Sequence, residues 1–145
     1  MKIISAAFKA GELLPSQYTC DGADVNPPLA FSAVPTGTKS LVLICSDPDA
    51  VGGEWIHWLV WNIGPKINSI AENSVPAGAV LGTTSFGQSG YGGPCPPSGV
   101  HRYYFKLYAL DIILSLGPEA EMEQLTQALS GHILAEAELL GRYGR

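Results

Sequence analysis

Residues His101–Asp111 read HRYYFKLYALD, and apolar and polar side chains alternate along them. Successive side chains of a β-strand point to opposite faces, so this alternation predicts a strand with one inward face. The inward face would carry His101, Tyr103, Phe105 and Leu107. An imidazole and a phenol would therefore lie side by side on an otherwise apolar face.

Two more stretches predict buried strands. Residues Ser40–Ser46 (SLVLICS) form a continuous apolar run that ends before Asp47-Pro48, where we expect a turn. Residues Trp55–Ile63 (WIHWLVWNI) are rich in aromatic and β-branched side chains, which favour strands. Alternation in this second stretch would place on one face Trp55, His57, Leu59 and Trp61.

The last part of the chain has a different period. After Pro118, apolar residues recur at spacings of three and four, with Glu and Gln between them. This pattern predicts a C-terminal amphipathic helix that Gly131 could interrupt and that Gly141 would cap. Its apolar positions are Met122, Leu125, Leu129, Ile133, Ala137 and Leu140.

The composition indicates a single globular domain over residues 1–145. The chain is 46% hydrophobic and 14% charged, which suits one apolar core and argues against disorder. A formal net charge of −5 argues against a nucleic-acid partner, since proteins that bind the phosphate backbone carry Lys and Arg clusters. The sequence shows no signal peptide, membrane span or lipidation motif, so we expect a cytoplasmic protein without membrane attachment.

The cysteines predict neither a disulfide framework nor a zinc site. The chain has three of them, Cys20, Cys45 and Cys95, which is an odd number without paired spacing. We therefore expect reduced thiols. Cys95 and His101 belong to one segment, so the thiolate–imidazole pair of a hydrolase is an alternative to the simpler interpretation of Cys95 as a packing residue.

The segment Gly87–Tyr103 (GQSGYGGPCPPSGVHRY) is the strongest candidate for a binding site. Its glycines let backbone N–H groups approach a ligand and its prolines restrict the shape of the loop, a combination that suits an anion. It ends on His101 and Tyr103, which can both donate hydrogen bonds. The competing interpretation is that these two are ordinary half-buried strand residues.

A second constellation is Asp47-Pro48-Asp49, with His57 eight residues after Asp49. A carboxylate near a histidine can orient and charge it. Asp-Pro-Asp alone is also typical of a turn with side-chain-to-backbone hydrogen bonds. Two histidines and an aspartate could form a metal site, although the sequence offers no third histidine nearby.

Together these runs resemble the phosphatidylethanolamine-binding protein family, which includes Raf kinase inhibitor protein, and most closely its small bacterial and archaeal members. The resemblance covers nearly the full length, and the fourth of the runs below is the most specific. The runs are TCDGADVNPPL (Thr19–Leu29), SDPDA (Ser46–Ala50), EWIHWLVWNI (Glu54–Ile63), FGQSGYGGPCPPSGVHRYYFKLYALD (Phe86–Asp111) and GHILAEAELLGRY (Gly131–Tyr143).

The resemblance implies a mainly β fold, an antiparallel β-sandwich with peripheral helices. It also implies a small pocket at one end for phosphate or the phosphorylated head group of a lipid or nucleotide. Carried over by position, the ligand-binding residues are Asp47, Asp49, Trp55, His57, Gly93, Pro96, His101 and Tyr103. The family has cis X–Pro bonds near the pocket, for which the candidates here are Pro28, Pro48, Pro96 and Pro97. Val51 and Phe31 depart from the family pattern and bear on ligand selectivity.

We therefore expect a phosphate-binding protein with a regulatory role, not an enzyme, and no cofactor. In this hypothesis a phosphate monoester lies between His57, His101, Tyr103 and backbone N–H groups around Gly93, while Asp47 holds a histidine or meets a ligand ammonium group. The alternative is an inhibitor of a kinase or protease that acts through loops around the pocket. A homodimer is a further expectation that the sequence leaves open.

Overall fold

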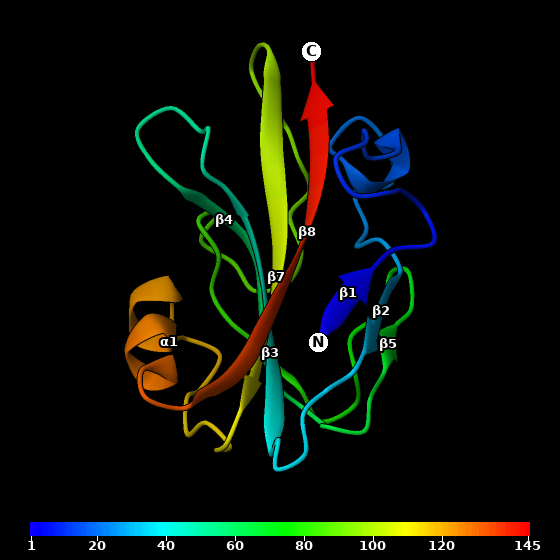
Figure 1. Cartoon of the computed structure of the whole chain (residues 1–145). Helices are drawn as coiled ribbons and strands as arrows, with labels where there is room; N and C mark the ends of the chain where they lie inside the picture. The colour runs from blue at the N-terminus through cyan, green and yellow to red at the C-terminus, as the bar shows by residue number, and fades with distance from the viewer.

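The computed structural model describes residues Met1–Arg145 as two antiparallel β-sheets with one α-helix (Figure 1). The strands are β1 (Lys2–Ile4), β2 (Leu29–Ser32), β3 (Ser40–Asp47), β4 (Trp55–Ile63), β5 (Ser69–Ile70), β6 (Val80–Leu81), β7 (Val100–Leu110) and β8 (Ile133–Gly144). The helix α1 covers Met122–Leu129, and a short 3-10 turn covers Ser16–Tyr18. The larger sheet has the order β6-β4-β3-β7-β8, and the smaller has the order β1-β2-β5. The predicted mainly β sandwich is confirmed.

Strand β3 is the centre of the larger sheet. All eight of its residues are buried, as its continuous apolar run predicts. It pairs on one side with β4 and on the other with β7, both antiparallel. The predicted turn follows directly after Asp47, so the end of β3 lies at one end of the sheet.

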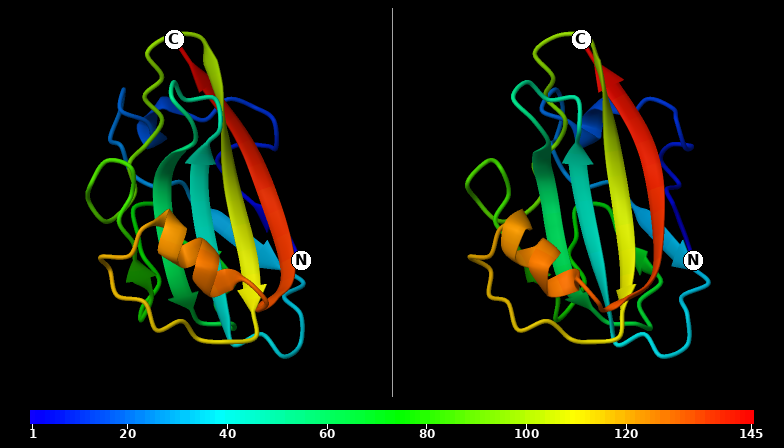
Figure 2. Two further views of the ribbon diagram at one scale, coloured as in Figure 1. Left: turned by 90° about the vertical axis from the view of Figure 1, so that its left-hand side faces the viewer. Right: turned by 60° about the vertical axis from the view of Figure 1, so that its left-hand side comes forward.

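The larger sheet carries an apolar core on each face. Between the two sheets, 18 buried residues pack together, including Trp58, Tyr103 and Phe105. On the opposite face, 10 buried residues, including Trp61 and Leu125, pack between the sheet and α1 (Figure 2). The protein is therefore layered as helix, five-stranded sheet and three-stranded sheet.

Strand β7 has the predicted alternation, whereas β4 does not keep it. In β7 the face that begins with His101 is buried. In β4, the chain advances by two residues while β3 advances by one, from Ser46 to Cys45. Such a β-bulge reverses the alternation beyond it. Leu59 and Trp61 therefore belong to the core beneath α1, on the face opposite the one predicted with His57.

The prediction of a C-terminal helix is correct only for its first part. Helix α1 begins after a capping box formed by Glu121 and Gln124, and it ends at Leu129. Gly131, with a φ of 83°, then turns the chain, and Ile133–Gly144 form β8 instead of a second stretch of helix. One α-helix is present where the resemblance implies several. No helix is long and apolar enough to cross a membrane.

The spacing of four residues explains the error. Residues four apart share a face in a helix, but any even spacing shares a face in a strand, so Ile133 and Ala137 fit both structures. Pairing decides between them. Strand β8 pairs with β7 along its whole length, from Val100 opposite Gly144 to Leu110 opposite Ile133. This pairing satisfies backbone N–H and C=O groups on the outer edge of β7, which would have no partner strand if Ile133–Gly144 formed a helix.

All peptide bonds are trans. The cis X–Pro bonds that the resemblance implies are therefore absent at each candidate position, namely Pro28, Pro48, Pro96 and Pro97.

Gly82 offers a test of the core beneath α1. A Cβ atom at position 82 would overlap ring carbons of Trp61, and this ring is fully buried. We predict that Gly82→Ala lowers the free energy of unfolding by about 1–3 kcal/mol, because the ring cannot move without disturbing its neighbours. The matched control is Gly64→Ala, whose Cβ would make an ordinary contact of 3.6 Å with Ile67. Urea unfolding compares the two, and equal losses would contradict the close packing.

Candidate functional site

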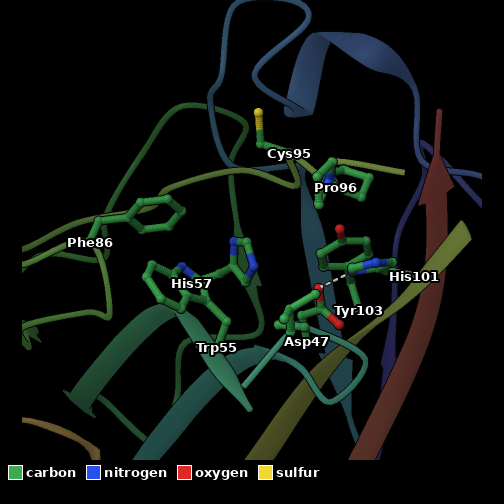
Figure 3. Close-up of a pocket in the computed structure, with 11 residues that line it drawn as sticks. Asp47, Trp55, His57, Phe86, Cys95, Pro96, His101 and Tyr103 are labelled. Carbon is green, nitrogen blue, oxygen red and sulfur yellow. Dashed lines mark hydrogen bonds and ion pairs between the residues drawn. The ribbon is translucent and has the colours of Figure 1, made fainter. Parts of the chain in front are cut away.

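A cavity of about 280 Å³ opens at the end of the larger sheet, where β3 ends and β4 and β7 begin (Figure 3). Six of the eight site residues predicted from sequence line it: Asp47, Trp55, His57, Pro96, His101 and Tyr103. The sequence prediction missed the other lining residues, which are Ala50, Val51, Phe86, Cys95 and Pro97. The two predicted residues outside the lining are Asp49 and Gly93.

Asp47 holds His101 on the floor of the cavity. Its Oδ2 lies 2.6 Å from Nδ1 of His101, and its Oδ1 accepts the backbone N–H of Asp49 at 2.7 Å. Both interpretations of Asp-Pro-Asp therefore hold, since it turns the chain and also orients a histidine. The histidine that Asp47 contacts is His101 of β7, not His57.

This contact determines what His101 can do. Nδ1–H donates to the carboxylate, so Nε2 remains available to the cavity, which His101 lines. As an imidazolium, the ring donates a hydrogen bond from Nε2, whereas in the neutral form Nε2 only accepts one. His101 is therefore suited to donate to an anion.

His57 faces a different partner. Its Nδ1 lies 2.7 Å from the carbonyl oxygen of Gly92, and its ring packs edge-on against Tyr103 with centroids 5.3 Å apart. Burial lowers the pKa of His57, and this effect outweighs the Gly92 carbonyl and the Asp47 charge, which raise it. The ring is therefore neutral at neutral pH, with Nδ1–H donating to Gly92 and Nε2 offering a lone pair.

Tyr103 supplies the third polar group on the floor. Only 1% of the residue is exposed, and its hydroxyl points into the cavity (Figure 3). Burial, and after it the negative charge of Asp47, raise the pKa of Tyr103 above its usual range. The phenol therefore stays protonated and can donate a hydrogen bond.

The rim of the cavity is apolar. Trp55 and Phe86 meet edge to face with centroids 5.5 Å apart, and Phe86 also meets His57 edge to face at 5.4 Å. Val51, one of the two departures from the family pattern, lies on the rim with 90% of its surface exposed, whereas Phe31 is buried in the core between the sheets. Phe86 lies outside the predicted strands, so strand alternation could not identify it as a site residue. Its position at the start of the Gly-rich run is the sequence feature that could have done so.

The loop above the floor is tied down through its glycines. Gly92 donates its N–H to the carbonyl of His57 at 2.9 Å, and Gly93 donates its N–H to Oδ1 of Asp24 at 2.7 Å. The N–H groups of Gly92 and Gly93 are thus already used within the protein. The Gly93 N–H itself is therefore engaged with Asp24, and the polar side chains on the floor of the cavity are those of Asp47, His57, His101 and Tyr103.

Asp49 stabilises the turn next to the rim. Its carboxylate accepts two hydrogen bonds from the Arg102 guanidinium, at 2.8 and 2.9 Å, and a third from the Arg102 backbone N–H at 2.9 Å. The bonds to Arg102 lower the pKa of Asp49 to about 2. Asp49 therefore anchors the turn to β7 from outside the cavity.

A disulfide joins Cys20 to Cys95, with Cα atoms 5.4 Å apart. This overturns the expectation of reduced thiols, and the pairing was invisible because the two residues are 75 positions apart. The Cys95–His101 hydrolase alternative is wrong, since the Cys95 sulfur is bonded. The remaining thiol, Cys45, is buried, and burial raises its pKa. Disulfides are rare in the cytosol of most organisms, so the bond is at odds with the cytoplasmic location predicted from sequence.

The metal alternative needs three ligands close together. No group of three or more His, Cys, Asp or Glu side chains in the structure is placed to hold a metal ion.

Relatives of this chain span its full length. A family model described as phosphatidylethanolamine-binding protein matches residues 4–144. A UPF0098 protein of Methanothermobacter thermautotrophicus is 48% identical over 150 residues, which cover 100% of this chain and 99% of the relative. A UPF0098 protein of Chlamydia trachomatis is 47% identical, with 99% and 98% covered.

Solved structures with the same fold are also described as members or homologues of this family. A putative phosphatidylethanolamine-binding protein homologue from Chlamydia trachomatis has a TM-score of 0.95 and 46% identity, covering 99% of this chain and 97% of its own. YbcL of E. coli, described as a new member of the mammalian PEBP family, has a TM-score of 0.94 and 32% identity, covering 99% and 98%.

The buried His57 predicts how stability depends on pH. In the unfolded chain, residue His57 binds a proton below the ordinary histidine pKa of about 6.5, whereas in the folded protein its pKa is lower. The free energy of unfolding therefore falls as pH drops below about 6.5, and it becomes constant below the pKa of the folded state. We predict that His57→Asn loses less stability than the wild type between about pH 7 and pH 5. Denaturant unfolding across pH measures this, with the exposed His132→Asn as control. Parallel curves for wild type and His57→Asn would contradict the neutral ring.

The disulfide predicts a second change in stability. We expect the Cys20→Ser/Cys95→Ser double variant to lose about 2–4 kcal/mol of unfolding free energy, because the bond closes a long loop in the unfolded chain. Guanidinium unfolding measures the loss. A reductant should produce the same loss in the wild type and none in the variant, and an unchanged wild type under reduction would show that the bond adds no stability.

Proposed function

Because the chain belongs to the phosphatidylethanolamine-binding protein family, we propose that its cavity binds the phosphate group of a small phosphorylated ligand and that the protein has a regulatory role. One observation carries the proposal. Three buried polar side chains meet on the floor of a single cavity: His57 from β4, and His101 and Tyr103 from β7, the two strands on either side of β3.

The three groups match the chemistry of a phosphate monoester. The His101 imidazolium and the Tyr103 hydroxyl donate to two phosphate oxygens, each charge-assisted bond contributing about 1.5–3 kcal/mol. The neutral His57 accepts a hydrogen bond from a protonated phosphate oxygen. In this proposal Asp47 acts by orienting His101, since its Oδ2 accepts from Nδ1 of that ring and its Oδ1 accepts from the backbone N–H of Asp49.

In this proposal the site binds and does not catalyse. The one cysteine on the cavity is held in a disulfide, and Asp47 is engaged with His101, so neither is free to act as a nucleophile. A regulatory role follows if occupancy of the cavity changes how the rim loops meet a protein partner. Inhibition of a kinase or protease through those loops without any phosphate is the competing function.

We predict that inorganic phosphate and phosphoethanolamine bind saturably and that His101→Ala weakens binding about 10- to 100-fold. Tryptophan fluorescence reports binding, because Trp55 lines the cavity while Trp58 and Trp61 are fully buried. The matched control is His132→Ala, which removes a similar His–Asp pair, Nδ1 to Oδ1 of Asp111 at 2.8 Å, outside the cavity. Calorimetry confirms the affinities.

The same titration tests the charge state of the site. Affinity should decrease as pH rises, because a neutral imidazole that keeps its proton on Nδ1 cannot donate from Nε2 to the phosphate. An affinity that stays constant from mildly acidic to alkaline pH would contradict the role of the imidazolium. Absence of binding by a folded protein would reject the phosphate site and favour inhibition through the rim loops.

A further inference from the structure

The Cys20–Cys95 disulfide joins one wall of the cavity to a loop outside it. Cys95 lines the cavity together with Pro96 and Pro97, whereas Cys20 follows the short 3-10 turn and is not part of the lining. Both cysteines are exposed. Figure 3 shows the Cys95 sulfur pointing away from the two histidines of the floor, so a reaction at this sulfur does not need access to the floor.

The bond also holds the middle of this wall in place. At one end of the wall the Pro94 carbonyl accepts the N–H of Cys20 at 3.1 Å, and at the other end Gly99 exchanges two backbone hydrogen bonds with Arg145, at 3.0 and 3.1 Å. Between these ends, residues 95–98 make no backbone hydrogen bond within the protein. The stretch is rich in proline, which has no N–H to donate. The disulfide is therefore the covalent tie that fixes the middle of the wall.

The loop on the Cys20 side is ordered independently of the bond. Thr19 is fully buried, and its hydroxyl donates to a backbone carbonyl of the 3-10 turn at 2.8 Å and accepts the N–H of Asp21 at 3.2 Å. The Asp21 carboxylate in turn accepts from the Tyr143 hydroxyl at 2.6 Å. Breaking the bond would thus leave Cys20 in place and free the wall that carries Cys95.

The two sulfur atoms have different neighbours. Nη2 of Arg145 lies 3.2 Å from Sγ of Cys20, and Sγ of Cys95 has no such neighbour. The Arg145 guanidinium also forms an ion pair with Asp21, which offsets part of its charge but keeps it beside the sulfur. A nearby cation stabilises a thiolate, and the sulfur that forms the more stable thiolate is the better leaving group. Cys20 is therefore the sulfur that leaves, and Cys95 is the sulfur that is attacked.

We propose that Cys95 is a site of reversible thiolation by a thiol of low molecular weight, which releases Cys20 as a thiolate beside Arg145 and loosens the wall of the cavity. The attacking thiolate forms a bond to Sγ of Cys95, the bond between the two cysteines breaks, and its electron pair passes to Sγ of Cys20. One disulfide replaces another, so no oxidant or reductant is consumed, and the proton that the thiol gave up is available to Cys20.

The reaction reverses when the Cys20 thiolate attacks Cys95 and expels the thiol, which restores the wall. Only the effect of thiolation on ligand binding rests on the proposed phosphate site. The choice of Cys95 over Cys20 rests on the surroundings of the two sulfur atoms alone.

Brief treatment of the folded wild-type protein with reduced glutathione, quenched with iodoacetamide, identifies the attacked sulfur. Peptide mapping by mass spectrometry locates glutathione on one cysteine and the alkyl group on the other. We expect about three times as much glutathione on Cys95 as on Cys20, or more. The ratio should fall close to one in Arg145→Gln and stay nearer the wild-type value in Arg145→Lys, which keeps the charge. The matched control is Arg142→Gln, since Arg142 donates to the Gly11 carbonyl and not to sulfur.

Three results of the mapping would contradict the proposal. Equal labelling of the two cysteines, or more glutathione on Cys20, would overturn the choice of Cys95. An unchanged ratio in Arg145→Gln would overturn the role of the guanidinium. Glutathione on the urea-unfolded protein but not on the folded protein would show that the folded protein closes the bond to thiols.

The trapped product of this experiment measures the effect on the cavity. With glutathione on Cys95 and an alkyl group on Cys20, the bond cannot re-form. We expect inorganic phosphate to bind this product about three- to tenfold more weakly than untreated wild type in calorimetry, because ordering the freed wall costs entropy. Circular dichroism checks that the product is folded.

The outcomes separate this proposal from the proposed function. Equal phosphate affinity before and after thiolation would overturn the regulation of the cavity and leave the phosphate site standing. An unfolded product would also overturn it, since a regulatory modification must leave the protein folded. If untreated wild type does not bind phosphate, the proposed phosphate site fails, whereas the mapping still decides whether Cys95 is the thiolated residue.

Discussion

The hydrogen-bonded pairing of β3 with both β4 and β7 is the constraint on which the rest of the protein depends. With all eight residues buried, β3 contributes side chains to the cores on both faces of the sheet. Its antiparallel neighbours begin near the point where it ends: Asp47 lies opposite Trp55, the first residue of β4, and Ser46 lies opposite Tyr104, near the start of β7. Asp47, His57 and His101 come together for this topological reason, although 54 positions separate Asp47 from His101 along the chain.

The fold also gives two histidine side chains different partners, and so different chemical roles. His101 lies against the Asp47 carboxylate, which accepts from its Nδ1. His57 is buried against a backbone carbonyl, and its ring is neutral with a free lone pair on Nε2. A phosphate group needs donors and, when protonated, also an acceptor. The bulge in β4 matters here, because bulges re-aim side chains near functional sites, and this one turns His57 toward Tyr103.

The long loop between β6 and β7 forms the upper wall of the cavity without regular structure of its own. It is anchored at Gly92 to β4, at Gly93 to Asp24, and at Cys95 by the disulfide to Cys20. The N–H groups of Gly92 and Gly93 bond within the protein, so these two residues fix the shape of the loop over the cavity. Phe86, near the start of this loop, lines the rim of the cavity.

The sequence by itself determined the parts that depend on local periodicity and on specific motifs. The strands at Ser40–Asp47 and Val100–Leu110 follow from their side-chain patterns, and the motif order was enough to indicate the family and six lining residues. Tertiary structure decided what pairing and proximity control. Spacings of four residues suit a helix and a strand equally, so the pattern of Ile133–Gly144 did not distinguish them. These residues form a strand because they pair with the free edge of β7. Three further features require residues distant in sequence to meet, and no local pattern carries that information. They are the bulge at His57, the Cys20–Cys95 bond and the pairing of Asp47 with His101.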